Sequence, residues 1–187
     1  MSKESTVVTG SKTRWSYVRV FEPKVNDEGK SEYTISLIIP KSSTRTIEKI
    51  KAAIQAAYAD GESKLAGNSK TAPPLASIRT PLRDGDLDKP DDPAYKDAYF
   101  INAKCWNNPP KVVDANMNVI IDKSEVYSGC YGRAHIEFYA YNNKAKGIGC
   151  LLHGLQKIAD GEPLGGHVNV EAAFAEAEDD DMDDFLR

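Results

Sequence analysis

Aromatic and basic side chains occur together along three separate segments of the chain, and this combination suits the chemistry of unpaired nucleotides. The segments are residues 14–21, 98–106 and 131–141, and in each of them aromatic or charged residues alternate with small or aliphatic ones. Aromatic rings stack on exposed bases at roughly 1–3 kcal/mol per base, and interspersed Arg and Lys neutralise the phosphates that join them. The three segments therefore point to a surface for a single strand of nucleic acid.

Alternate residues of a β-strand point to opposite faces of its sheet, so each segment divides into two faces. One face of each segment is small or aliphatic. The other face carries Trp15, Tyr17, Arg19 and Phe21 in the first segment, Phe100, Asn102, Lys104 and Trp106 in the second, and Tyr131, Arg133, His135, Glu137, Tyr139 and Tyr141 in the third. Three strands are therefore expected to present aromatic and basic groups on the side away from their aliphatic residues.

We predict two kinds of DNA contact on this surface. The aromatic residues expected there are Trp15, Tyr17, Phe100, Trp106, Tyr131, Tyr139 and Tyr141, and the basic residues expected to neutralise phosphates are Arg14, Arg19, Lys104, Lys111, Arg133, Lys144 and Lys146. The alternative is that the aromatic residues belong to the core or pack under a loop, as large aromatic residues usually do. Binding is favoured because Arg19, Lys104 and Arg133 share these faces and would be costly to bury unpaired.

The elements that must position these residues are mostly strands. Period-two alternation and β-branched residues predict strands over residues 12–22, 32–39, 98–106, 131–141 and 147–155, with a short hairpin over 111–113 and 119–121. Ile47, Ile50, Ile54 and Ala57 recur at helical spacing between a Ser-Ser-Thr cluster and Gly61, which predicts one amphipathic helix. No parallel β-α-β alternation is visible, so the fold class expected is mainly β, a small antiparallel barrel with a single helix at one end.

Residues 61–97 lack sustained periodicity and form a long irregular loop in this prediction. The acidic run from Asp84 to Asp92 offers an alternative function, a metal-dependent nuclease, because clustered carboxylates hold Mg²⁺. Such sites draw their ligands from several rigid elements, whereas these acids lie in one loop. The run also imitates an EF-hand, but Lys89 and Tyr95 replace the required Gly and Glu. We therefore expect no catalytic and no metal site.

The charge is divided unevenly along the 187 residues. Residues 171–187 contain eight acids and one base, a net charge of −7. Residues 1–170 carry +3, so the whole chain has a net charge of −4. With few large apolar groups, residues 171–187 are expected to be a disordered acidic tail, and residues 1–170 one domain. The tail is either a solubility device or a competitor of phosphate for the basic surface, with Phe185 and Leu186 as an apolar anchor for a partner.

Several functional classes are not favoured by the composition. The longest aliphatic stretch, residues 35–39, is too short to cross a bilayer, and no apolar run follows the basic residue near the N-terminus, so the cytoplasm is the expected compartment. Cys105, Cys130 and Cys150 are far apart and suggest neither a disulfide framework nor a zinc site. No cofactor is expected, and a homodimer is left open.

Six blocks, taken in order, resemble one family: residues 99–104, 109–114, 127–133, 139–143, 146–149 and 160–166 are similar to the OB-fold single-stranded DNA-binding proteins of tailed bacteriophages. The resemblance covers most of residues 12–170. It implies a non-enzymatic protein that coats and protects single-stranded DNA in phage replication, recombination and repair. An RNA-binding OB module remains an alternative.

The same resemblance implies that the acidic C-terminus contacts replication partners. The residues matched to this role are Asp179, Asp180, Asp181, Asp183, Asp184, Phe185 and Leu186. This chain departs from the family pattern because it ends Phe185-Leu186-Arg187 rather than on the aromatic residue itself.

Overall fold

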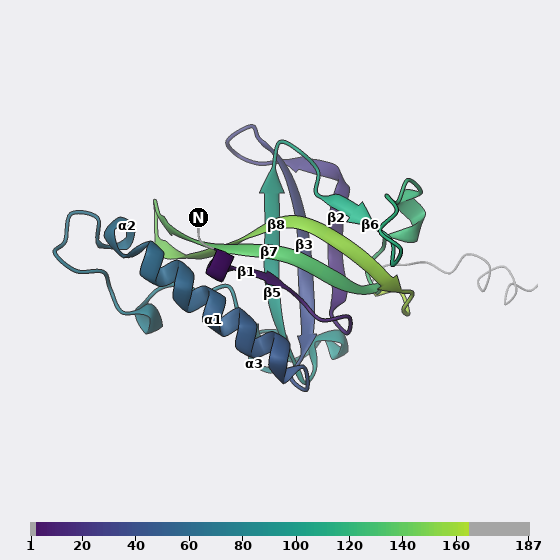
Figure 1. Ribbon diagram of the computed structural model, residues 1–187, viewed down its shortest axis with the longest axis horizontal. Helices are drawn as coiled ribbons and strands as arrows, with labels where there is room; N and C mark the ends of the chain where they lie inside the picture. The colour runs from purple at the N-terminus through teal and green to yellow at the C-terminus, as the bar shows by residue number, and fades with distance from the viewer. Residues whose placement is uncertain (1–2, 165–187) are drawn as a thin grey trace, which may run out of the picture.

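Five long strands of the described residues close into a barrel. The structure is a computed structural model that describes residues 3–164 (Figure 1). The barrel strands are β2 (Arg14–Val25), β3 (Ser31–Pro40), β5 (Ala98–Trp106), β7 (Tyr131–Asn142) and β8 (Lys146–Ala159). They pair in the order β2-β3-β5-β8-β7, and β7 returns to β2. This five-stranded closure is the architecture of the OB-fold, so the mainly β barrel expected from the sequence is confirmed.

The barrel closes at two seams of different kinds. Most neighbouring barrel strands are antiparallel, but β5 and β8 are parallel, with Lys104 opposite Leu151. The β2–β7 seam has one register pair, Arg14 with Tyr131. The sequence predicted a purely antiparallel barrel, so the parallel β5–β8 pair is a departure from it. The direction of β8 is set by its antiparallel pairing with β7, and in that direction β8 runs parallel to β5.

Three short strands extend the barrel. β1 (Thr6–Val8) pairs with β7, β4 (Arg83–Asp84) pairs with β5, and β6 (Lys111–Val113) pairs with β8. β1 was not anticipated because three residues carry little periodicity. The predicted hairpin partner of β6, residues 119–121, pairs with it through one antiparallel bridge, Val119 with Val113, and the Ile120 N–H donates to the Val112 carbonyl at 3.0 Å. The pairing is as predicted, but residues 119–121 do not form a strand of their own. Ile120 is buried in the main core, but Val119 and Ile121 on either side of it are exposed.

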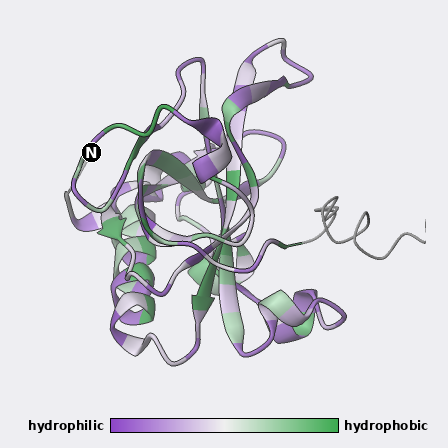
Figure 2. Ribbon diagram, turned by 90° about the vertical axis from the view of Figure 1, so that its right-hand side faces the viewer, coloured by the Kyte–Doolittle hydropathy of each residue, from purple (hydrophilic) through white to green (hydrophobic). Residues whose placement is uncertain are grey.

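The predicted amphipathic helix is α1 (Thr44–Asp60), which packs against β7 and β1. Its buried residues are Thr46, Ile47, Ile50, Ala53, Ile54 and Ala57. Ser43 stands at the N-cap without a side-chain hydrogen bond, and Gly61 ends the helix by donating its N–H to the carbonyls of Ala57 and Tyr58. Polar and apolar residues alternate along the helices and strands, as expected for elements that bury one face (Figure 2).

Residues 61–97 form a connection built from short pieces. These are α2 (Glu62–Ala66), the 3₁₀ helix Leu75–Ser77, β4, α3 (Gly85–Asp88) and the 3₁₀ helix Pro93–Tyr95. Tyr95 is fully buried in a small second core with Ile38, Ala98 and Phe100, and its hydroxyl hydrogen-bonds Ser36 Oγ at 3.0 Å. The end of this connection is therefore fastened over β3 and β5.

The main core fills the barrel interior. The predicted apolar face of β7 is buried throughout, from Gly132 to Ala140 in steps of two. Trp15, Leu37, Ile101 and Phe138 are also buried there. Within residues 3–164, no helix has the length and apolar character needed to cross a bilayer.

Candidate nucleic-acid interface

A groove of about 1470 Å³ crosses the outer surface of the barrel. Its floor is formed by outward-facing residues of β3, β5, β7 and β8, and its walls by residues 26–30, 79–83 and 143–144. Four aromatic residues line it: Tyr17, Trp106, Tyr139 and Tyr141. Such a floor with polar walls offers flat rings beside charged groups.

The groove has a net positive lining. Among the described residues that line it, the basic ones are Lys30, Arg79, Arg83, Lys89, Lys104 and Lys144, and the acidic ones are Asp27, Glu28 and Glu32. The wall at residues 26–30 carries two acids beside Lys30. The excess of positive charge therefore comes from the wall at residues 79–83 and from Lys89, Lys104 and Lys144, and a negatively charged backbone would be attracted there. The groove therefore combines stacking surfaces with cations.

The outward face of β5 supplies the middle of the floor. Asn102, Lys104 and Trp106 all line the groove, while Ile101, Ala103 and Cys105 are buried, although Ala103 also borders the groove. Lys104 Nζ lies 5.4 Å from the centre of the Trp106 ring system and 3.6 Å from a Glu32 carboxylate oxygen. The division of this strand into two faces is as predicted.

Tyr17 reaches the groove because β2 carries a bulge. Ser16 pairs with Ser36 and Arg19 with Thr34, so two residues of β2 lie opposite one residue of β3. Tyr17 has a φ of 47°, and 63% of it is exposed. The bulge turns the ring away from the barrel wall and toward the groove.

Lys89 is a groove residue that the sequence analysis missed. Its Nζ lies 4.7 Å from the centre of the Tyr17 ring, 4.5 Å from Tyr95 and 5.4 Å from Phe100. An ammonium group over ring faces is attracted by the π-electrons, which holds Lys89 at the rim. Its position among the acids of residues 84–92 gave no local sign of this role.

Tyr139 and Tyr141 line the groove from β7. They lie on the same face of β7, with ring centres 6.4 Å apart and planes inclined by 55°. Burial raises the pKa of the Tyr139 phenol, so the hydroxyl stays neutral. Both residues were predicted at the binding surface, and the structure places them side by side.

Two predicted contact residues are buried, which corrects their assignment. Trp15 is 0% exposed and belongs to the main core, because the bulge after it puts Trp15 and Tyr17 on opposite sides of β2. Phe100 is on the outward face of β5 as predicted, but the Tyr95 ring packs edge-on against it at 5.1 Å. The connection that ends at Tyr95 thus covers Phe100, and neither ring is available to a base.

Six further predicted residues lie outside the groove: Arg14, Arg19, Lys111, Tyr131, Arg133 and Lys146. Arg14 stacks on the Tyr131 ring at 5.3 Å and donates to the Gly129 carbonyl, so it serves the β2–β7 seam. Arg19 borders two smaller depressions, and Tyr17 lines one of them. The predicted residues that the structure brings together are Tyr17, Lys104, Trp106, Tyr139, Tyr141 and Lys144.

The wall at residues 79–83 was also missed. Arg79 joins the edge of β8, because its carbonyl accepts the Ile148 N–H at 2.8 Å. Arg83 belongs to β4, beside β5. These residues lie far along the chain from the strands they flank, in a segment without periodicity, so only the tertiary structure shows that they reach the groove.

Three of the acids proposed for a nuclease are paired with cations. Lys41 Nζ contacts Asp84 at 3.0 Å and Asp86 at 2.7 Å, and Arg83 contacts Asp88 at 3.0 Å. The Lys41 ammonium lowers the pKa of the Asp86 carboxyl, and these hydrogen bonds raise the pKa of Lys41. Asp84 also caps α3 by accepting the Asp86 N–H. These three acids therefore make contacts that tie the connection to Lys41 and to itself.

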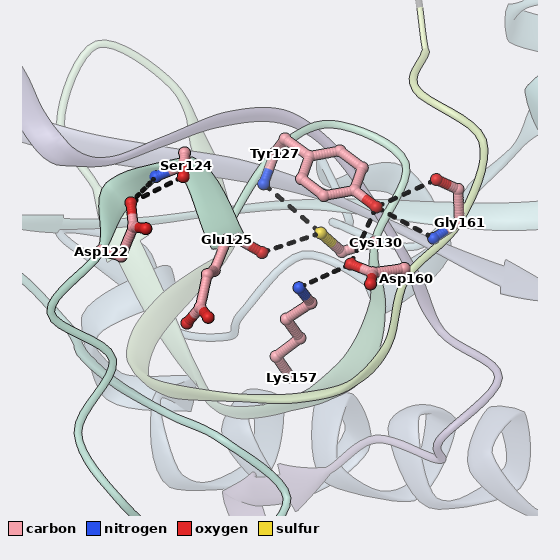
Figure 3. Close-up of polar contacts among 8 residues, drawn as sticks. All are labelled: Asp122, Ser124, Glu125, Tyr127, Cys130, Lys157, Asp160 and Gly161. Carbon is pink, nitrogen blue, oxygen red and sulfur yellow. Dashed lines mark hydrogen bonds and ion pairs between the residues drawn. The ribbon is translucent and has the colours of Figure 1, made fainter.

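Residues 160–164 are strapped across the start of β7. The Tyr127 hydroxyl contacts Asp160 and the carbonyl of Gly161, each at 3.0 Å, and Lys157 contacts Asp160 at 2.7 Å (Figure 3). Lys157 lowers the pKa of Asp160, and burial raises that of the neighbouring Cys130. The strap fixes where the chain leaves the barrel. The predicted tail lies outside the described residues.

A five-stranded barrel whose outer groove combines aromatic rings with cations is the architecture of OB domains for single-stranded nucleic acids. Residues 5–186 match the family described as Enterobacter phage Enc34, ssDNA-binding protein, and the chain belongs to this family. Protein p50 of Acyrthosiphon pisum secondary endosymbiont phage 1 is 35% identical over 167 residues, which cover 84% of this chain and 87% of that protein. The resemblance stated from the sequence blocks is thereby confirmed.

Solved structures agree with this assignment. The single-stranded DNA-binding protein of bacteriophage Enc34 in complex with ssDNA has a TM-score of 0.71 and 28% identity, covering 87% of this chain and 91% of that chain. A C-terminal truncation of the same protein has a TM-score of 0.69 and 27% identity, covering 87% and 90%. The single-stranded DNA-binding protein of bacteriophage T7 shares the fold, with a TM-score of 0.61, 16% identity and coverage of 94% and 96%. These relatives are described as binding proteins and not as nucleases.

Proposed function

We propose that this protein binds single-stranded DNA in the groove and coats it during phage replication and recombination in the host cytoplasm. The observation that carries the proposal is the groove itself, in which Tyr17, Trp106, Tyr139 and Tyr141 lie among six basic residues. The similar Enc34 protein has been solved in complex with ssDNA. No chemistry on the strand is required for this role.

In this proposal the bases stack on the aromatic rings and the phosphates lie against the cations. Stacking needs only the flat face of a base, so it accepts any sequence, as a coating protein requires. Lys104 beside Trp106, and Lys89 beside Tyr17, place a cation within 5.4 Å and 4.7 Å of a stacking ring. A base and its phosphate are thus bound at adjacent points.

Strand selectivity tests the proposal. We expect oligo-dT to quench the Trp106 fluorescence and to bind at least about tenfold more tightly than duplex DNA, whose base faces are hidden in the stack. Titrations with oligo-dT, oligo-U and a duplex of equal length measure this directly. Equal affinity for the duplex would contradict the groove proposal, and tighter binding of oligo-U would favour the RNA-binding alternative.

The acidic tail predicted from the sequence has a role in the same proposal. Residues 171–187 carry −7 and would compete with phosphate for the positive groove at high effective concentration, because both belong to one chain. Phe185 and Leu186 would then anchor replication or recombination proteins once DNA displaces the tail. The strap at residues 160–164 supports this, since it fastens the chain to the barrel that bears the groove shortly before the tail sequence begins.

Removal of residues 171–187 should tighten binding to oligo-dT, most strongly at low salt where charges are least screened. Affinity measured at several salt concentrations should fall more steeply for the truncated protein, because salt no longer releases a competing tail. The same truncation should abolish capture of replication proteins. Unchanged affinity together with unchanged capture would reduce the tail to a solubility device.

The homodimer left open by the sequence stays a prediction. Light scattering of the full-length and the truncated protein would test it.

A further inference from the structure

Each of the two groove tyrosines on β7 lies opposite a glycine. In the β7–β8 register, Tyr139 pairs with Gly149 and Tyr141 pairs with Gly147. Between the two glycines, Ile148 is buried in the core, so both glycines are on the outward face together with the tyrosines. A pair of tyrosines thus faces a pair of glycines across two antiparallel strands.

The tyrosine rings occupy the space that side chains on β8 would need. A Cβ at Gly149 would lie 2.5 Å from Cζ and 2.6 Å from Oη of Tyr139. A Cβ at Gly147 would lie 2.5 Å from Oη and 2.7 Å from Cζ of Tyr141. Real Cβ atoms do not approach this closely, so the rings can lean across β8 only because both residues are glycines.

We propose that Gly147 and Gly149 are positioning residues that lay Tyr139 and Tyr141 against the sheet as two adjacent platforms, each for one base of an unstacked strand. This inference rests on the proposed function and adds to it the positions of two successive bases in the groove. With its far end over β8, each ring presents its free side to the groove. Bulkier residues at 147 and 149 would lift the rings into the path of the strand.

The spacing of the rings defines the form of the strand. Their centres are 6.4 Å apart and their planes are inclined by 55°. Bases stacked in a duplex strand are separated by about 3.4 Å, roughly half of that distance. Two successive bases therefore reach both rings only when the strand is extended and its bases are splayed apart.

Gly149 offers the cleaner test of the two glycines. All three atoms nearest to its Cβ position belong to Tyr139. The Cβ position at Gly147 is also 2.8 Å from the Arg79 carbonyl, so a substitution there would move the groove wall as well as the ring. The first group that Gly149→Ala displaces is therefore the Tyr139 ring.

We expect Gly149→Ala to weaken binding to oligo-dT by about as much as Tyr139→Ala, roughly 5- to 150-fold, since one base loses its platform. The double variant Gly149→Ala/Tyr139→Ala should bind no more weakly than Tyr139→Ala alone, because the glycine acts only through that ring. Gly154→Ala is the control. It is the same change on β8 outside the groove, where the Cβ meets only the Lys111 carbonyl at 3.2 Å, and it should leave affinity unchanged.

Thermal melts of all four proteins separate positioning from folding. If Gly149→Ala alone is unstable, the double variant, which lacks the obstructing ring, should regain the stability of Tyr139→Ala. Additive losses of affinity in the double variant would overturn the inference, as would wild-type affinity of Gly149→Ala. In either case, weaker binding by Trp106→Ala would show that the groove still binds DNA. If Trp106→Ala and Tyr139→Ala both bind as wild type, the proposed function itself fails.

Discussion

Replacing Trp15 by Ala is expected to lower the free energy of unfolding by about 3–5 kcal/mol, the usual cost of removing a large buried aromatic side chain. Trp15 is 0% exposed, and its ring packs on the backbone of Gly132. Its indole Nε1 has no hydrogen-bond partner within residues 3–164, so packing rather than polar contact holds the ring. Denaturant titration followed by circular dichroism measures the loss.

The matched variant is Trp106→Ala, since both residues are tryptophans on barrel strands. Trp106 is partly exposed in the groove, so its removal should leave the unfolding free energy nearly unchanged and weaken DNA binding by about 1–3 kcal/mol. Binding by Trp15→Ala, measured where the variant is folded, should match wild type. A stable Trp15→Ala protein with weakened DNA binding would show that Trp15 contacts DNA and would contradict its assignment to the core.

Neutralising three groove cations should have the second large effect. In the triple variant Arg79→Gln, Lys104→Gln and Lys144→Gln, affinity for oligo-dT should fall strongly at low salt. The slope of log affinity against log salt should become shallower by about 2, because each phosphate contact on a single strand contributes roughly 0.7. Fluorescence titrations across a range of salt concentrations give both quantities.

A triple variant of equal charge provides the control. Lys49, Lys111 and Arg133 are exposed and lie outside the groove, and their replacement by Gln changes the net charge by the same amount. We expect the salt slope of this control to stay close to that of the wild type. Equal slopes in both triple variants would mean that the protein attracts DNA through its overall charge and that the groove has no special role.

Strand positions and faces were predictable from the sequence because they depend on local alternation. The strand predicted over residues 98–106 is β5 with the same limits, and its outward residues Asn102, Lys104 and Trp106 line the groove. The helical spacing from Ile47 to Ala57 likewise predicted α1. Each of these features follows from the spacing of hydrophobic residues within a short window of the sequence.

The features that escaped prediction depend on contacts between distant segments. A single bulge residue reversed the faces after Trp15, and no composition signal marks a bulge at Tyr17. Phe100 was placed on the correct face, but the connection ending at Tyr95 covers it from 5.1 Å. Arg79 and Lys89 reach the groove only because that same connection folds back over the barrel. The alternation of residues predicts which face of a strand points outward, but it does not predict which distant segment covers that face.

At Tyr17, the backbone conformation of the bulge lowers the stability of the fold, while the side chain lines the groove. A non-glycine residue with φ of 47° is strained, and such strain usually costs on the order of 1–3 kcal/mol. Glycine would relieve it, but glycine has no ring to offer the groove or Lys89. Selection for heat resistance alone would therefore favour glycine at position 17, whereas in the proposed function the strain is the cost of a ring on which a base stacks.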